Sequence, residues 1–184
     1  MLVFVDTNVW FPISVADLIL RSVEAGIFDL AWSDESLSEL ERILVAVKKL
    51  EPDKARLFIW QIKSTAPYGR IDPQDYMSLM DGMVGPDQDD HIFSAAVQGG
   101  KIDILLTENL TDFPQVDIGP NAISRRPDDF FVGLLQSFPE EFLVLIEQMS
   151  ANLKRPPLTE GEVLARLAKC GLPEFEKQMR GLVV

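Results

Sequence analysis

The sequence predicts an α/β protein in which a mainly parallel sheet lies between two layers of helices, with a further run of helices at the C-terminus. Two apolar, β-rich segments, residues 2–5 and 102–106, are typical of strands buried on both faces. Helical patterns separate these strands, as they do when helices connect the parallel strands of one sheet. From Asp128 onward the pattern is helical throughout. Together these observations predict a three-layer α/β/α domain followed by a helical extension.

The elements of the sheet domain follow from the spacing of apolar residues. Helices are expected over residues 12–25, 33–47, 52–62, 74–80 and 92–97, the last ending at Gly99-Gly100. On the helix at 52–62 we expect Leu57 and Trp60 to face inward, with Ala55 and Ile59 as further candidates. Further extended segments are expected at residues 28–32, as a short strand or link, and at residues 118–124, as a last strand.

Pro127 marks the expected end of the sheet domain, which gives two parts: residues 1–127 and a helical extension over residues 128–184. Within the extension, residues 130–135 and 142–149 are apolar-rich. Shorter helices are expected at 158–167 and 174–182, after a break at residues 154–157. A chain of 184 residues is long enough for one such α/β domain plus a short appendage.

The residue counts exclude several kinds of site. The chain has one cysteine, Cys170, and one histidine, His91, which excludes an intrachain disulfide, a cysteine-based zinc cluster and the usual zinc sites. His91 itself is expected to be partly buried and hydrogen-bonded. No signal peptide and no apolar stretch near the roughly 20 residues of a membrane span are visible. We therefore expect a cytoplasmic protein that does not enter a membrane.

The chain is strongly acidic, with 29 acidic and 17 basic residues and a net charge of −12. This balance argues against a protein that holds nucleic acid on a broad basic surface. A nuclease is not excluded, because a metal site made of carboxylates concentrates negative charge until the metal binds.

Polar side chains follow both clear strands. Asp6 comes directly after residues 2–5, and Thr107, Asn109 and Asp112 come after residues 102–106. Ligands of parallel α/β sheets collect beyond the carboxyl ends of the strands, so we expect these residues to meet at one edge.

Two further acids come from helices. Asp89 stands three and four residues before Ile92 and Phe93 on a helix with a buried row, so we expect it to lean toward the interior. Glu39 lies beside an apolar stripe on its own helix. Simpler interpretations remain open for each acid: Asp6 as a turn residue, Asp89 and Asp90 as helix caps, and Glu39 as a solvated side chain.

Several carboxylates close together repel one another unless a cation neutralises them. Oxygen ligands without softer partners select Mg²⁺ or Mn²⁺. Such an ion activates water and stabilises charge on a phosphoryl oxygen, so the pattern points to phosphodiester hydrolysis.

Two other classes that place an Asp near the first strand fit less well. A haloacid-dehalogenase-type phosphatase needs a second Asp two residues after the first, and Asn8 stands there. A response-regulator receiver uses a pair of acids near its first strand, and residues 4–6 supply only Asp6.

Four segments, in order and spacing, resemble a PIN domain, and most of all the VapC-type ribonuclease toxins of bacterial type II toxin–antitoxin pairs. The resemblance covers residues 1 to about 127 and rests on residues 5–9, 33–44, 87–96 and 106–114. The tail, with Pro127-Asp128-Asp129-Phe130 and later Arg155-Pro156-Pro157-Leu158, resembles a C-terminal extension of one VapC-like subgroup.

The resemblance implies an Mg²⁺- or Mn²⁺-dependent endoribonuclease with an RNA substrate, a cognate antitoxin protein and a homodimeric state. The acids that it assigns to the metal site are Asp6, Glu39, Asp89 and Asp112. The residues that it expects to orient water or carboxylates are Asn8, Thr107 and Asn109. Asn109 occupies a position where many relatives carry Asp, which leaves Asp112 as the candidate fourth acid. Asp90 is the alternative to Asp89. The alternative function is a catalytically silent PIN-fold protein that binds or regulates a partner, which the net charge and Asn109 favour.

Overall fold

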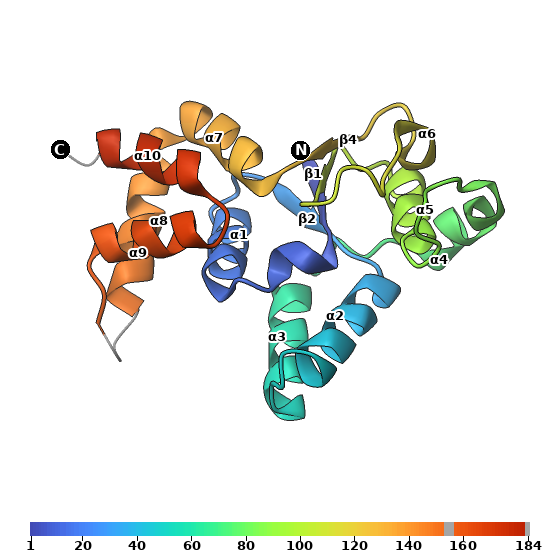
Figure 1. Cartoon of the computed structure of the whole chain (residues 1–184), viewed down its shortest axis with the longest axis horizontal. Coiled ribbons are helices and arrows are strands. Elements are labelled where there is room, and N and C mark those ends of the chain that lie inside the picture. Colours follow the sequence, from blue (N-terminus) through green and yellow to red (C-terminus); the bar gives the residue numbers. More distant parts are fainter. Residues whose placement is uncertain (153–156, 183–184) are drawn as a thin grey trace. The chain divides into compact units, whose positions relative to one another are not determined.

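The structure is a computed structural model that describes residues 1–152 and 157–182 (Figure 1). The chain forms two compact units. The first, here called the sheet unit, combines Met1–Phe11 with Phe28–Arg125, and the second, the helical unit, combines Pro12–Ile27 with Arg126–Val184. Each unit is described separately below.

The sheet unit is built on four parallel strands. They lie in the order β2 (Asp29–Ala31), β1 (Leu2–Val5), β3 (Ile104–Leu106) and β4 (Ile123–Arg125). Phe4 of β1 pairs with Ala31 on one side and with Leu105 on the other. Successive residues of the two central strands are buried, so both faces of the sheet are covered. The predicted α/β fold with a parallel sheet and C-terminal helices is confirmed.

Short helices and turns connect the strands of this unit. In chain order they are the 3₁₀ helix η1 (Thr7–Trp10), α2 (Asp34–Ala46), α3 (Pro52–Thr65), α4 (Pro73–Tyr76), the 3₁₀ helix η2 (Met77–Gly82), α5 (His91–Gly99) and α6 (Gln115–Ile118). The helices expected from apolar spacing are therefore present. The last expected strand, residues 118–124, is shorter and begins later, because Ile118 still belongs to α6 and β4 runs from Ile123 to Arg125.

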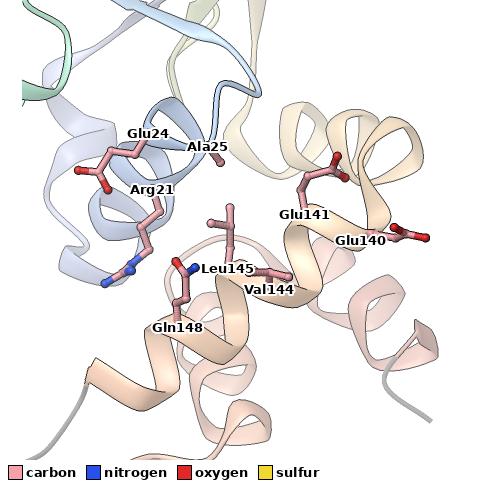
Figure 2. A pocket seen from close by; sticks show the side chains of 8 residues that line it. All are labelled: Arg21, Glu24, Ala25, Glu140, Glu141, Val144, Leu145 and Gln148. Carbon is pink, nitrogen blue, oxygen red and sulfur yellow. The ribbon is translucent and has the colours of Figure 1, made fainter.

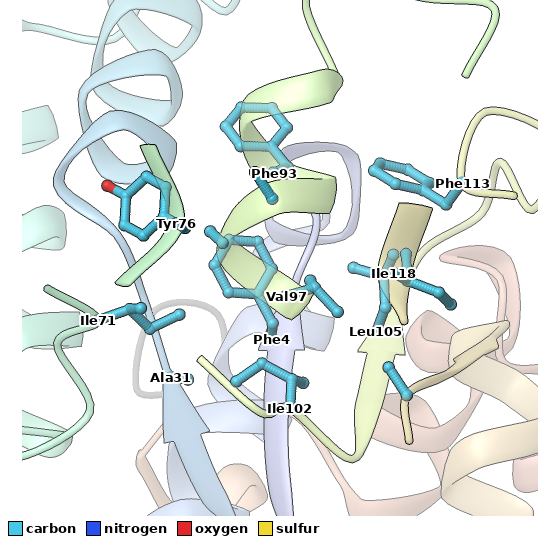
Figure 3. Packing of buried hydrophobic residues seen from close by; sticks show 13 residues of the cluster. Phe4, Ala31, Ile71, Tyr76, Phe93, Val97, Ile102, Leu105, Phe113 and Ile118 are labelled. Atoms are coloured by element: carbon cyan, nitrogen blue, oxygen red, sulfur yellow. The ribbon is translucent and has the colours of Figure 1, made fainter. Parts of the chain in front are cut away.

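The α5 helix packs on one face of the sheet. Figure 3 shows Phe93 and Val97 of this helix lying over Phe4 and Leu105, the residues of β1 and β3 that belong to the same buried cluster. The rings of Phe4 and Phe93 lie 6.5 Å apart between centroids. Small side chains on α5 let the helix approach the strands closely. This packing fixes where α5 begins, and the residues directly before it carry the acids considered below.

On α3, the expectation that Leu57 and Trp60 face inward is wrong. Their exposed fractions are 63% and 64%, whereas Ala55, Ile59 and Ile62 are buried. The stripe of residues 55, 59 and 62 has the spacing of one helix face. The small side chain of Ala55 allows close contact at that face. Which face of α3 is buried is therefore decided by how well its side chains pack against the rest of the unit, and not by how large they are.

The helical unit consists of α1 (Ile13–Glu24), α7 (Pro127–Ser137), α8 (Pro139–Asn152), α9 (Glu160–Lys169) and α10 (Pro173–Leu182). Phe131, Phe142 and Phe175 form its centre, with ring centroids 5.4 to 6.1 Å apart. The helices expected in the extension are present; residues 154–156 of the expected break lie outside the described residues. None of the described helices is long and apolar enough to cross a membrane.

The α1 helix groups with these C-terminal helices and not with the sheet. It contacts α8 and α9, so the helical unit is formed by a segment near the start of the chain and by everything after Arg125. A groove of about 480 Å³ lies between the end of α1 and α8, and Figure 2 shows Val144 and Leu145 on α8 between Gln148 and Glu141. Residues 1–127 therefore do not all pack in one unit, because Pro12–Ile27 belongs to the helical unit.

Candidate active site

The ends of β1 and β3 are joined by a buried hydrogen bond between side chains. Asp6, 4% exposed, directly follows β1, and its backbone N–H donates to the carbonyl of Leu106 at 2.9 Å. Thr107 directly follows β3, and its hydroxyl donates to Oδ2 of Asp6 at 2.7 Å. The two residues that sequence placed at one edge of the sheet do meet there.

Glu39 reaches the same edge from α2. The Thr7 hydroxyl donates to Oε2 of Glu39 at 2.7 Å, and Arg42, one turn further along α2, lies 3.6 Å from the other carboxylate oxygen. Thr7 is buried. It was not among the expected site residues, although its place directly after Asp6 was a signal for it.

Asp112 is held by the turn that follows β3. The side-chain amide of Asn109 donates to Asp112, and the Thr111 hydroxyl donates to the amide oxygen of Asn109 at 2.9 Å. The backbone N–H of Asn109 donates to the Thr107 hydroxyl at 3.0 Å. Asn109 thus orients the acid three residues after it. Asn8 behaves differently: its side chain is exposed, and its backbone N–H is what interacts with the Asp6 carboxylate.

Asp90, and not Asp89, faces the other acids. Asp89 is exposed and its backbone N–H donates to Oδ1 of Asp87, so the expectation that it leans inward is wrong. Asp90 is the N-cap residue of α5, partly buried, and its side chain makes no capping bond. It stands three and four residues before Phe93 and Ser94, which are both buried. The spacing argument was sound, but it applied one residue later.

Burial and like charge raise the pKa of two carboxyls in this cluster. The pKa of Asp90 rises to about 7, first because the carboxyl loses solvent and then because negative Asp6, Asp87, Asp112 and Glu39 face it. Burial also raises the pKa of Asp6, although the bond from Thr107 opposes the rise. Acids from four separate segments therefore act on one another at the carboxyl ends of β1 and β3.

These residues suit a hard divalent cation by chemical type. Every candidate ligand is a carboxylate oxygen, and the buried charge of Asp6 calls for a cation or donors. Within the described residues, however, no three acidic, histidine or cysteine side chains stand close enough together to hold a metal as they are placed. Thr7, Thr107 and Asn109 each donate a hydrogen bond to one of these carboxylates, and a cation would have to draw the acids closer together.

Asp117 holds the loop that leads to Asp90. It is 1% exposed and lies on α6, and its carboxylate accepts the backbone N–H groups of Val84 at 2.9 Å and Gly85 at 2.7 Å. The carbonyl of Gly85 in turn accepts a hydrogen bond from Nε2 of His91 at 2.8 Å. His91 is thus partly buried and hydrogen-bonded, as expected. Nothing in the sequence around Asp117 distinguished it from the other acidic residues of the chain.

The comparison with known families concerns the other unit. Residues 127–181 match the family described as the VapC50 C-terminal domain. No curated protein and no solved structure matches the chain. The match covers α7 to α9 and nearly all of α10, and it lies outside the acid cluster. It supports a relation of this chain to the VapC toxins of toxin–antitoxin systems.

Proposed function

We propose that this chain is an Mg²⁺- or Mn²⁺-dependent endoribonuclease with a PIN-like sheet unit, and that it is the toxin of a type II toxin–antitoxin pair. The observation that carries the proposal is the meeting of Asp6, Glu39, Asp90 and Asp112 at one edge of the parallel sheet. The match of the C-terminal residues to a VapC domain supports the toxin assignment from an independent part of the chain.

The four acids have distinct tasks in this proposal. Asp6 and Asp90 hold the cation, since their partly or fully buried charges gain most from it, and Glu39 and Asp112 complete the oxygen ligands. A bound divalent cation activates water and neutralises charge on the phosphoryl group. Thr107 and Thr7 fix the directions of Asp6 and Glu39, because each hydroxyl donates to one oxygen of its carboxylate. No histidine is required as a general base.

The proposed partners follow from the VapC relation. A toxin of this kind has a cognate antitoxin protein, and RNA is the proposed substrate. We further propose a homodimer, which rests on the sequence resemblance alone. With a net charge of −12, the chain is expected to hold RNA chiefly through the bound cation and not through a broad basic surface.

Cleavage of a mixed RNA pool tests the proposal. The wild-type protein should cleave RNA in Mg²⁺ or Mn²⁺ and stop when EDTA removes the metal. Asp6→Asn should abolish cleavage and leave the circular dichroism spectrum unchanged, because the amide is isosteric but uncharged. The matched control is Asp81→Asn, which changes an exposed acid of the same unit and should cleave normally.

The same assay addresses the alternative of a catalytically silent binding protein, which Asn109 and the acidic charge favour. A folded wild-type chain that leaves RNA intact with either metal would establish that alternative. Equal cleavage by wild type and Asp6→Asn would show instead that the nuclease activity comes from another site or from a contaminant.

A further inference from the structure

Gly85 is held at three points between the loops that carry Asp90 and Asp112. Its N–H donates to the buried Asp117 carboxylate at 2.7 Å, and its carbonyl accepts from Nε2 of His91 at 2.8 Å. Because a carbonyl only accepts, Nε2 of His91 carries the proton in this bond. The α-carbon of Gly85 lies against the backbone of Asp112. One residue thus connects α6, the start of α5 and the turn after β3.

The contact with Asp112 leaves no room for a side chain at residue 85. A Cβ built on Gly85 would lie 2.8 Å from the carbonyl oxygen of Asp112 and 3.3 Å from Oδ2 of Asp117. The first of these atoms belongs to the backbone and cannot rotate away. The absence of a side chain therefore determines how near the loop before Asp90 comes to the loop of Asp112.

Asp117 is bound to the loop through both of its oxygens. Oδ1 accepts the N–H of Val84 at 3.1 Å, while Oδ2 accepts those of Val84 at 2.9 Å and Gly85 at 2.7 Å. Hydrogen bonds to a charged acceptor are stronger than neutral ones, and burial strengthens them further. With both oxygens engaged and the side chain buried, Asp117 is placed to hold the backbone and not to bind a cation.

The loop needs such a restraint because its own charges push it outward. Asp87 and Asp90 flank a turn that is closed by long backbone hydrogen bonds of 3.3 Å, and the charges of Asp87, Asp6, Glu39 and Asp112 all act on Asp90. Without a cation, these like charges favour an opened loop. A metal site that opened in this way would have to be closed again at the expense of binding free energy.

We propose that Asp117, Gly85 and His91 form a clamp that sets the spacing of Asp90 and Asp112 and so prepares the acid cluster for a divalent cation. All three are positioning residues, and none binds the cation. This inference rests on the proposed function, from which it takes the cation site. It adds the part of the chain that determines how tightly that site binds.

The test compares two aspartates with the same structural task. Asp117 and Asp128 each accept two successive backbone N–H groups, in the case of Asp128 those of Glu174 and Phe175 in the helical unit. Asp117→Asn and Asp128→Asn should both lower the melting temperature of the full chain. Only Asp117→Asn should weaken Mn²⁺ binding, measured by electron paramagnetic resonance, by about 10- to 100-fold, as for other residues that orient metal ligands. At saturating Mn²⁺ its cleavage rate should approach that of wild type.

Two further variants keep the inference testable if Asp117→Asn does not fold. His91→Phe removes the bond to Gly85 and should weaken Mn²⁺ binding, whereas His91→Gln keeps a donor at a similar distance and should restore much of it. Gly85→Ala should weaken binding as well, because its methyl group meets the Asp112 carbonyl. Hydrogen exchange at the Val84 and Gly85 amides reports directly whether the clamp has opened.

Several outcomes would overturn the clamp. One is that Asp117→Asn binds Mn²⁺ as tightly as the wild type although the amides of residues 84 and 85 exchange fast. Another is that Asp128→Asn loses as much Mn²⁺ affinity as Asp117→Asn. A third is that the wild-type chain binds no Mn²⁺. Failure of the proposed function has a different signature. If the wild type binds Mn²⁺ but cleaves no RNA, the nuclease proposal fails, and the clamp is still decided by the Mn²⁺ affinities of the variants.

Discussion

Both burial and the negative charges of neighbouring acids disfavour the ionised form of Asp90. Burial removes solvent from its carboxyl, and four other acids face it. Its side chain also makes no hydrogen bond to the start of α5, although it stands at the N-cap where such a bond is common. Among the described residues, this carboxylate neither caps its helix nor pairs with a base, so it is available to a cation.

At Asp90 and Asp89, neighbouring residues should give opposite results. Asp90→Asn should reduce RNA cleavage by roughly 100-fold or more, the scale seen when a group that stabilises transition-state charge is lost. Asp89→Asn should cleave at nearly the wild-type rate, because its side chain is exposed. Initial rates at one Mg²⁺ concentration decide the matter. The assignment of Asp90 fails if Asp89→Asn is the inactive variant.

The raised pKa of Asp90 predicts how stability depends on pH without metal. The carboxyl has a pKa of about 7 in the folded chain and about 3.9 in an unfolded one. Its protonation therefore stabilises the fold, a contribution fully present below about pH 4 and lost as the pH rises through about 7. In EDTA, Asp90→Asn should raise the melting temperature at pH 8 and change it little at pH 4. An equal change at both pH values would contradict the raised pKa.

Among the elements, α2 shows how local chemistry places a site residue. Ser33 begins the helix with a capping box, in which its hydroxyl accepts the N–H of Ser36 at 3.1 Å and the Ser36 hydroxyl accepts the N–H of Ser33. Buried Leu37, Leu40 and Leu44 fix the rotation of the helix. With start and rotation determined, Glu39 has one direction in which to point, which is toward Thr7.

Removing the cap of α2 should therefore affect both stability and activity. Ser33→Ala should lower the free energy of unfolding by about 1 kcal/mol and reduce cleavage by roughly tenfold, because a displaced Glu39 is a misplaced ligand. Thr159→Ala is the matched control: it removes a similar capping box from α9 and should lose similar stability without losing activity. Urea unfolding and initial rates measure the two effects. Equal activity in both variants would show that the α2 cap does not position Glu39.

At the scale of the whole molecule, the helical unit is discontinuous in sequence. Its α1 lies between β1 and β2 in the chain but contacts α8 and α9. The family match begins at Pro127 and so covers the C-terminal part of this unit without α1. The unit that carries the VapC resemblance is therefore completed by a helix from the first 30 residues.

A chain shortened to residues 1–127 tests this arrangement. It retains α1 but lacks α8 and α9, so apolar residues of α1 lose the helices that they contact. We expect this chain to aggregate or to lose helical content, as measured by size-exclusion chromatography and circular dichroism beside the full-length protein. A stable monomer with wild-type cleavage would show that the first 127 residues form an independent domain.

Much of the fold and part of the site followed from the sequence alone. Apolar runs and apolar spacing predicted the strands and most helices, because an element buried on one face or on both has a characteristic spacing of apolar residues along the chain. The meeting of Asp6 with Thr107 was also predictable, since the carboxyl ends of parallel strands share an edge. Asp112 was a candidate because it follows a predicted strand, and Glu39 because it lies beside the apolar stripe of its helix; the family resemblance assigned both to the same site.

Tertiary packing alone decided the rest. Asp89 and Asp90 are chemically alike and adjacent, and only the rotation of α5 against Phe4 and Leu105 determines which of them faces the cluster. The same holds for Leu57 and Trp60, because two stripes of α3 were apolar and the fit against the rest of the sheet unit selected one. The tasks of Thr7 and Asp117 and the grouping of α1 with distant helices depend on contacts between residues far apart in sequence, which no local pattern records.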